Sequence, residues 1–220
     1  MAKPSAKRRQ KGRQRKAAKR KQKRAISTRP RLTGGRALLR AAGGWPLHEC
    51  LLTKTWQEPG EIIQILVARR SPTGQIAVGT FLVDLGCLGV KSAFGRPLHT
   101  MQEYRELRDR MKANQDMIKA DINLAAKIIR EAIAYAEELG FKPDPDYRDA
   151  MLVLGDADPD ACEVPIPLGG KDGRPFFVAG PYDNVDQIMS KLTRKLGPDG
   201  FTFIVPMGGD EEILLFDEDE

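Results

Sequence analysis

Apolar residues recur every three or four positions between about residues 116 and 139, which is the spacing of one face of an α-helix. Lys, Arg and Glu occupy most positions between them, and Gly140 follows as a helix terminator. The pattern predicts an amphipathic helix, whose apolar face consists of Ile118, Ile122, Ala125, Ile129, Ala132, Ile133 and Ala136.

Three further segments carry helical signals. A capping box formed by Thr100 and Glu103 predicts a helix over about residues 100–112. Apolar residues spaced by three and four predict another helix over residues 185–196, which a Gly-Pro pair ends. A short helix is expected at residues 36–42, between two glycine pairs.

Strand signals alternate with these helices. Residues 61–70 are rich in β-branched side chains, and residues 75–86 follow after the turn sequence Ser-Pro-Thr-Gly, so the two segments predict a hairpin. Two apolar segments, 163–168 and 174–180, flank a glycine-rich turn, and residues 201–205 indicate a final strand. The sequence therefore predicts about five strands.

This set of elements predicts an α+β fold, with an antiparallel or mixed sheet of about five strands and helices on one face. Composition divides the chain into four parts. They are a cationic arm at residues 1–30, a connector at 31–48, an α+β body at 49–209 with a candidate boundary near residue 155, and an acidic tail at 210–220.

The 36 Lys and Arg and 30 Asp and Glu of the chain are unevenly distributed. Residues 1–48 contain 17 of the basic residues and no acid, whereas residues 210–220 contain seven acids. Residues 7–24 have no side chain that could form a core, so like-charge repulsion predicts an intrinsically disordered arm. The acidic tail is expected to be a solvated terminus, or alternatively a segment that competes with RNA for binding to the arm, within or between molecules.

A dense series of Lys and Arg predicts binding to a polyphosphate backbone, because each neutralised phosphate releases a counterion. The arm has no aromatic side chain for stacking on bases, so affinity without sequence specificity is expected. The expected phosphate-binding residues are Lys7, Arg8, Arg9, Lys11, Arg13, Arg15, Lys16, Lys19, Arg20, Lys21, Lys23 and Arg24.

The composition of the arm resembles that of the extended arms of ribosomal proteins, which thread between folded RNA helices. This resemblance covers about the first 30 residues. It implies an RNA-binding, ribosome-associated protein whose partner is ribosomal or other structured RNA, with ribosomal proteins as further candidates. The folded body is expected to dock against protein or a shaped RNA surface.

Basic residues at or near the ends of the predicted hairpin are expected to continue this surface onto the body, as an alternative to a simple solvated rim. They are Arg69, Arg70, Lys91 and Arg96. Phe94 and Trp56 are candidates for stacking on a base.

The arm alone also fits a DNA-associated or nuclear protein in which it is a targeting signal. The odd number of three cysteines favours a reducing compartment, so a cytoplasmic location is expected. No apolar run approaches the roughly 20 residues of a membrane span. No nucleotide-binding fingerprint is present, and no cofactor is expected.

A cysteine-dependent enzyme acting on RNA or a translation component is a further alternative. Cys87 lies in a glycine-rich bend near a lysine, which would lower the thiol pKa and favour a nucleophile, with His48 as base and Asp84 orienting it. Burial of a small apolar thiol is the simpler interpretation. A zinc site is also conceivable, but the spacing is too loose to predict a metal; its ligands would be His48, Cys50, Cys87 and His99.

Overall fold

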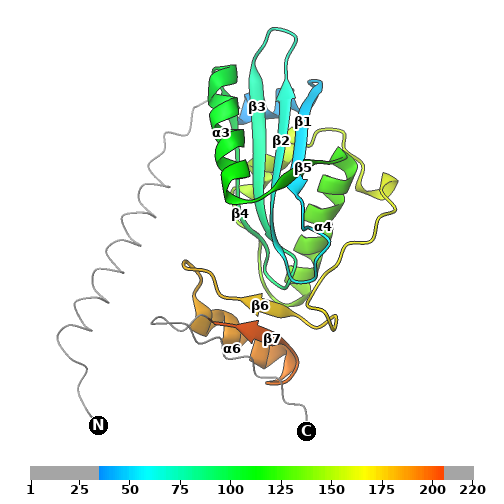
Figure 1. Ribbon diagram of the computed structural model, residues 1–220, viewed down its shortest axis with the longest axis vertical. Coiled ribbons are helices and arrows are strands. Elements are labelled where there is room, and N and C mark those ends of the chain that lie inside the picture. The colour runs from blue at the N-terminus through cyan, green and yellow to red at the C-terminus, as the bar shows by residue number, and fades with distance from the viewer. Residues whose placement is uncertain (1–34, 206–220) are drawn as a thin grey trace, which may run out of the picture. The chain divides into compact units, whose positions relative to one another are not determined.

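The computed structural model of the protein describes residues 35–205. The arm and the acidic tail lie outside the described residues. The helices are α2 (Gly35–Ala42), α3 (Met101–Asn114), α4 (Ile122–Glu138), α5 (Tyr147–Ala150) and α6 (Val185–Leu196), with 3-10 turns η1 (Met151–Val153) and η2 (Pro159–Ala161) (Figure 1). The strands are β1 (Leu47–Thr53), β2 (Ile62–Arg70), β3 (Ile76–Asp84), β4 (Gly89–Leu98), β5 (Met117–Lys119), β6 (Phe176–Val178) and β7 (Thr202–Ile204).

Five of the described strands form one antiparallel sheet in the order β4-β3-β2-β1-β5, which confirms the predicted α+β fold. The predicted hairpin is also confirmed, as β2 and β3, which pair along their whole length. Its turn is closed by the Ser71 amide, which donates to the Gln75 carbonyl at 2.9 Å. Gly74 adopts a φ of 92° in this turn, a conformation that favours glycine.

The members of the sheet differ from the strands that the sequence pattern predicts. Residues 163–168 form no strand, and Pro165 and Pro167 explain this because they cannot donate ladder hydrogen bonds. The sheet instead includes β1 and β4, which the pattern did not indicate. β4 is an edge strand, where Pro97 is tolerated.

The first turn of the long amphipathic segment is not helical. Its apolar residues near 117–119 pair with β1 as the short strand β5, and α4 begins only at Ile122. The Asp121 side chain caps α4 by accepting a hydrogen bond from the Asn123 amide at 2.7 Å. The predicted cap of α3 is confirmed, since the Thr100 hydroxyl accepts from the Glu103 amide at 3.1 Å.

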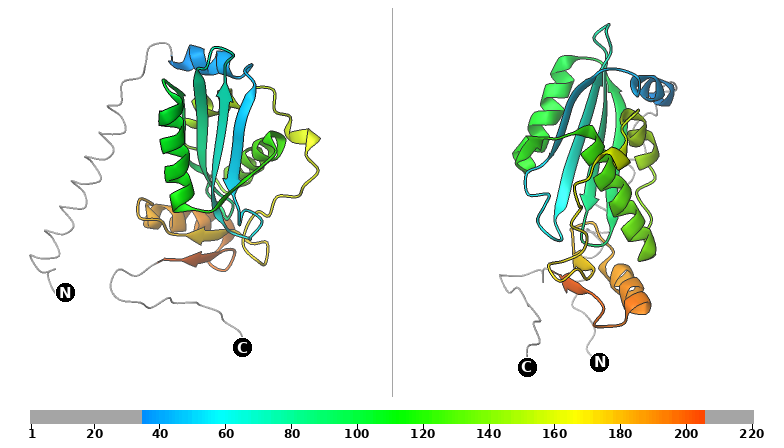
Figure 2. Two further views of the ribbon diagram at one scale, coloured as in Figure 1. Left: turned by 45° about the horizontal axis from the view of Figure 1, so that its top comes forward. Right: turned by 90° about the vertical axis from the view of Figure 1, so that its right-hand side faces the viewer.

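Helices cover both faces of the sheet, so the expectation of helices on one face is wrong (Figure 2). Alternate residues of β2 enter different cores. Ile63, Ile65 and Val67 pack in the core that contains α2, α4 and α5. Leu66 and Ala68 pack in the core that contains α3. Because both faces of the central strands are apolar, each face needs a covering layer.

Two glycines allow a helical segment to lie directly on the sheet. Gly79 of β3 and Gly95 of β4 are paired residues. A Cβ atom would lie 2.7 Å from the Ala150 carbonyl oxygen at Gly79, and 2.7 Å from the Asp149 carbonyl oxygen at Gly95. The segment formed by α5 and η1 therefore contacts the sheet backbone, and it presents its carbonyl groups to β2.

A smaller parallel unit, β6-α6-β7, packs at the β3–β4 turn (Figure 1). The predicted helix over 185–196 is confirmed as α6. Phe177, Leu192 and Phe201 of this unit share an apolar cluster with Cys87 and Leu88 of the turn. No helix within residues 35–205 has both the length and the apolar character needed to cross a membrane.

Candidate nucleic-acid interface

Cys87 and Asp84 lie together in the tight turn between β3 and β4. The Asp84 carboxylate accepts hydrogen bonds from the amides of Cys87, at 2.9 Å, and Leu88, at 3.4 Å. Cys87 is fully buried, and burial, reinforced by the negative charge of Asp84, raises the pKa of its thiol far above the usual range. The thiol therefore stays protonated, and the role of Asp84 is to fix the turn.

His48 lies at the opposite end of the sheet, so the proposed Cys–His–Asp arrangement does not form. Leu47, next to His48 on β1, pairs with Arg69 at one end of β2, whereas Asp84 pairs with Ile62 at the other end. Arg69 and Ile62 are seven positions apart along β2. Seven residues of a strand span about 24 Å. The His48 ring packs edge-on against Tyr104 instead, with 5.2 Å between ring centroids. The structure gives the cysteine-enzyme interpretation no active site at these residues.

The candidate zinc ligands are also dispersed. In the described part of the chain, no group of three or more His, Cys, Asp and Glu side chains is placed to hold a metal ion. Cys50 is buried within β1, and burial raises the pKa of its thiol to about 12. Its environment is that of a packed core residue.

Alkylation tests this description of the cysteines. In the native protein, iodoacetamide is expected to modify Cys162, which is partly exposed, and to leave Cys50 and Cys87 unmodified. In urea, all three cysteines of the chain should react. Mass spectrometry of the intact protein would count the adducts. Rapid modification of Cys87 under native conditions would contradict its burial and restore the nucleophile hypothesis.

Arg69 is not an exposed phosphate-binding residue, and this expectation is corrected. Only 5% of the residue is exposed. Its guanidinium donates to the carbonyl oxygens of Trp45, Val153 and Leu154 at 2.6–2.7 Å, and to the Asp156 carboxylate at 3.0 Å. It is a structural cross-link between β2 and the segment after α5.

The other proposed contact residues on the body divide into accessible and inaccessible ones. Arg70 and Arg96 are exposed, and Arg96 lies over the ring of Phe94 at 5.7 Å. Trp56 is buried and cannot stack on a base. Lys91 is also unavailable, because its ammonium donates to the Asp183 carboxylate at 2.7 Å with 13% of each side chain exposed.

The described residues form a shallow basic cleft that the sequence interpretation missed. It lies between the chain that leaves the C-terminal end of α4 and the side of α6 that faces this chain. Two adjoining hollows of about 170 and 300 Å³ share Gly140 and Lys191. We call this the basic cleft; its lining residues are Leu139, Gly140, Phe141, Lys142, Gln187, Ile188, Lys191, Arg194 and Lys195.

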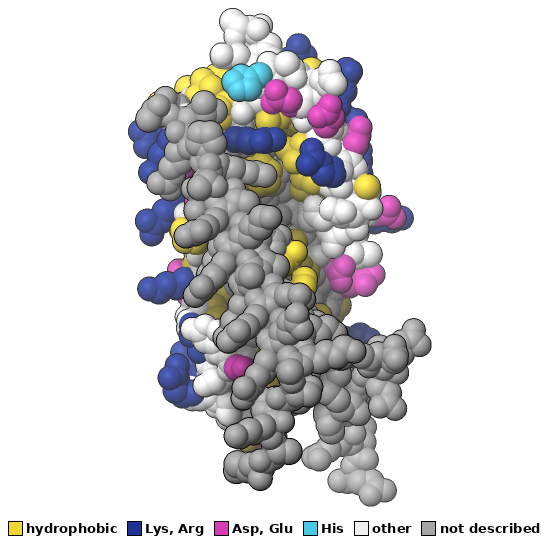
Figure 3. Space-filling model, turned by 90° about the vertical axis from the view of Figure 1, so that its left-hand side faces the viewer, with side chains coloured by type: hydrophobic (Ala, Val, Ile, Leu, Met, Phe, Trp, Pro, Cys, Tyr) yellow, Lys and Arg dark blue, Asp and Glu magenta, His cyan; other side chains and the backbone are white. Residues whose placement is uncertain are grey.

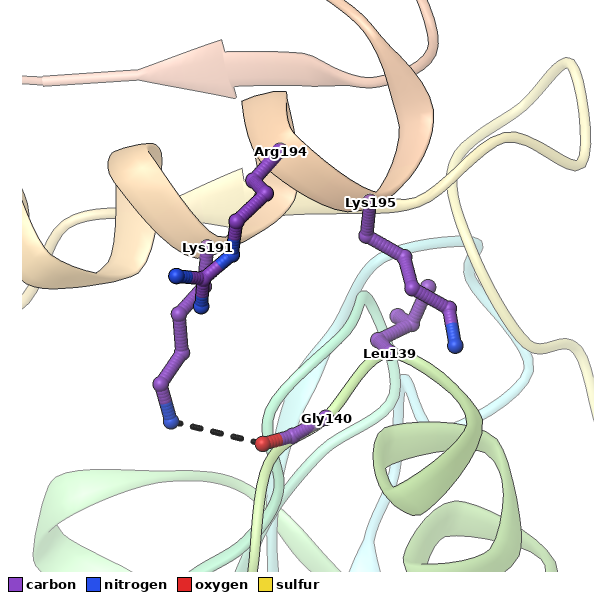
Figure 4. Close-up of a pocket in the computed structure, with 5 residues that line it drawn as sticks. All are labelled: Leu139, Gly140, Lys191, Arg194 and Lys195. Atoms are coloured by element: carbon purple, nitrogen blue, oxygen red, sulfur yellow. Dashed lines mark hydrogen bonds between the residues drawn. The ribbon is translucent and has the colours of Figure 1, made fainter.

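Four of these nine residues are cationic and none is acidic. Lys191 is held in place, since its ammonium donates to the Gly140 carbonyl at 3.3 Å (Figure 4). The same ammonium lies 5.1 Å from the ring centroid of Phe141. Arg194 projects from the same helix, and Lys195 lies beside Leu139 (Figure 4). Cations at positions i, i+3 and i+4 of the predicted helix were a visible signal, but they also suit the helix dipole.

Charge is nearly balanced over the described residues as a whole, which contain 21 Lys and Arg and 23 Asp and Glu. Its distribution is nevertheless uneven. On the face shown in Figure 3, Lys and Arg side chains follow one margin, and Asp and Glu side chains lie mainly toward the other margin, where further Lys and Arg are interspersed with them. Attraction of a polyanion to the body would therefore be local.

Comparison with known proteins adds no relative: no family model, no curated protein and no solved structure matches this chain.

Proposed function

We propose that this is an RNA-binding protein associated with the ribosome or another structured RNA. The observation that carries the proposal is the charge of residues 1–48, which contain 17 Lys and Arg and no acid. Such a segment has its natural counterpart in a phosphate backbone, where each contact releases a counterion. In this proposal the cationic arm supplies most of the affinity, and the folded body determines where the protein docks.

The near-neutral charge of the body supports the assignment of most of the affinity to the arm. Residues 35–205 carry a small excess of acids, so general attraction to a polyanion has to come from the arm. Trp56 is buried, and Phe94 has Arg96 over its ring. Base stacking on these two rings is therefore not favoured, and recognition of RNA shape and backbone is expected instead.

The dependence of RNA affinity on salt tests the proposal. If about half of the 14 basic residues in positions 1–30 contact phosphates, the arm alone should contribute roughly −5 to −6 to the slope of log K against log salt. Fluorescence anisotropy with a labelled structured RNA, measured from 50 to 300 mM KCl, gives this slope. A flat response, or no binding at low salt, would refute the phosphate-binding role of the arm.

Two companion measurements address the partner. Sucrose-gradient sedimentation of lysate at low and high salt should show the protein travelling with ribosomal particles at low salt and released at high salt. Competition with duplex DNA of the same length examines the DNA-associated alternative. Equal affinity for DNA and absence from ribosomal fractions would favour that alternative over the proposed RNA function.

A further inference from the structure

We propose that the basic cleft is a second RNA contact, which binds backbone phosphates and orients the folded body on the RNA. This inference rests on the proposed function and extends it from the arm to defined residues of the body. The cleft combines side chains from two segments about 50 positions apart, which are the residues after α4 and those of α6.

The electrostatics of the cleft favour an anion. Lys142, Lys191, Arg194 and Lys195 contribute four full positive charges. The C-terminal ends of α4 and α6 border the cleft, and each contributes roughly half a negative charge through its dipole. The positive charges therefore exceed the helix-end charges about fourfold.

Hydrogen bonding to the chain at the end of α4 occupies only one of the four cations of the basic cleft. Lys191 donates to the Gly140 carbonyl, which belongs to the loop just beyond the C-cap residue Leu139 of α4. Among the described residues, no ion pair involves Lys142, Arg194 or Lys195, and all three side chains are exposed. These three cations are available for a ligand, beside a lysine that is already positioned.

The size of the cleft favours a polymer backbone over a small molecule. Pockets that enclose small-molecule ligands usually measure about 300–1,000 Å³. The two hollows, of about 170 and 300 Å³, lie at or below that range. A phosphate backbone needs no enclosure, because it can pass along the surface and be held from one side. Arg194 adds a planar guanidinium that can contact two phosphate oxygens.

The test is a charge reversal in the full-length protein, Arg194→Glu with Lys195→Glu. The matched control is Arg110→Glu with Lys112→Glu, which changes the net charge equally at two exposed positions near the C-terminal end of a helix, α3. RNA affinity of the cleft variant is expected to fall tenfold or more at about 100 mM salt, and its salt slope to become shallower by roughly 1.4 to 1.8, for two lost contacts. The control should change affinity less than about twofold.

Several outcomes would overturn the inference. Equal losses in the cleft and control variants would show a general charge effect, and unchanged binding of a folded cleft variant would show that the cleft does not contact RNA. Thermal unfolding checks that each variant is folded. If the reversal does not fold, Arg194→Gln with Lys195→Gln takes its place, with Arg110→Gln and Lys112→Gln as control.

The proposed function and the cleft inference can fail separately. Failure of the wild-type protein to bind RNA at low salt refutes both. Salt-dependent binding by the wild type that the cleft variant retains refutes the cleft alone. Amide shifts at Gly140 and Lys191 on titration with inorganic phosphate, without any effect of the variant on RNA, would assign the cleft to free anions and overturn the RNA assignment.

Discussion

Replacement of Arg69 by methionine is expected to lower the free energy of unfolding by about 3–5 kcal/mol, because it leaves buried acceptors without a donor. The guanidinium of Arg69 donates to three backbone carbonyl groups and to the Asp156 carboxylate. Asp156 is largely exposed and can be solvated instead, so the loss comes from the three carbonyls. Methionine fills most of the space but donates no hydrogen bond.

Urea unfolding followed by circular dichroism measures this loss. The control is Arg70→Met, since Arg70 is the exposed neighbour on the same strand and its replacement should change stability by less than about 0.5 kcal/mol. The loss of stability in Arg69→Lys should lie between those of Arg69→Met and Arg70→Met, because an ammonium cannot reach all four acceptors. A loss below about 1 kcal/mol in Arg69→Met would contradict the structural role of the guanidinium. Folded Arg69→Met protein should keep wild-type RNA affinity.

Local signals in the sequence predicted those elements whose determinants are local. The capping box at Thr100 gave the start of α3, and the Ser-Pro-Thr-Gly turn gave the β2–β3 hairpin. β4 was missed because its sequence includes Gly95 and Pro97, which are poor strand formers. Its strand form depends on pairing with β3, and Gly95 is needed there because Ala150 packs against it.

The sites show the same division between local and long-range information. An arginine at the end of a strand usually extends into solvent, and nothing near Arg69 in the sequence indicates that its acceptors are more than 80 residues later at Val153 and Leu154. The cations of α6 were visible at helical spacing, but the other wall of the basic cleft comes from the residues after α4. Tertiary packing brings these two walls together, and the hydrophobic periodicity of the sequence does not predict which segments pack against each other.

Deletion of residues 1–30 is expected to have the largest effect on function. It removes 14 basic residues and, on the proposed function, should reduce RNA affinity at 50 mM salt by about 10³-fold or more. The remaining salt slope should be about −2 to −3.5, which three or four phosphate contacts in the basic cleft would produce. Anisotropy with the RNA used for the wild type measures both quantities.

Two arm variants separate charge from sequence in this experiment. A protein whose arm is scrambled but keeps its composition should bind RNA with wild-type affinity, because phosphate contacts depend on charge density and not on residue order. Replacement of the twelve Lys and Arg between residues 7 and 24 by Gln should cause most of the loss of RNA affinity that the deletion causes. If the deleted or neutralised protein binds RNA as tightly as the wild type, the arm is not the phosphate-binding element, and the basic cleft and the rest of the folded body would have to account for all of the affinity.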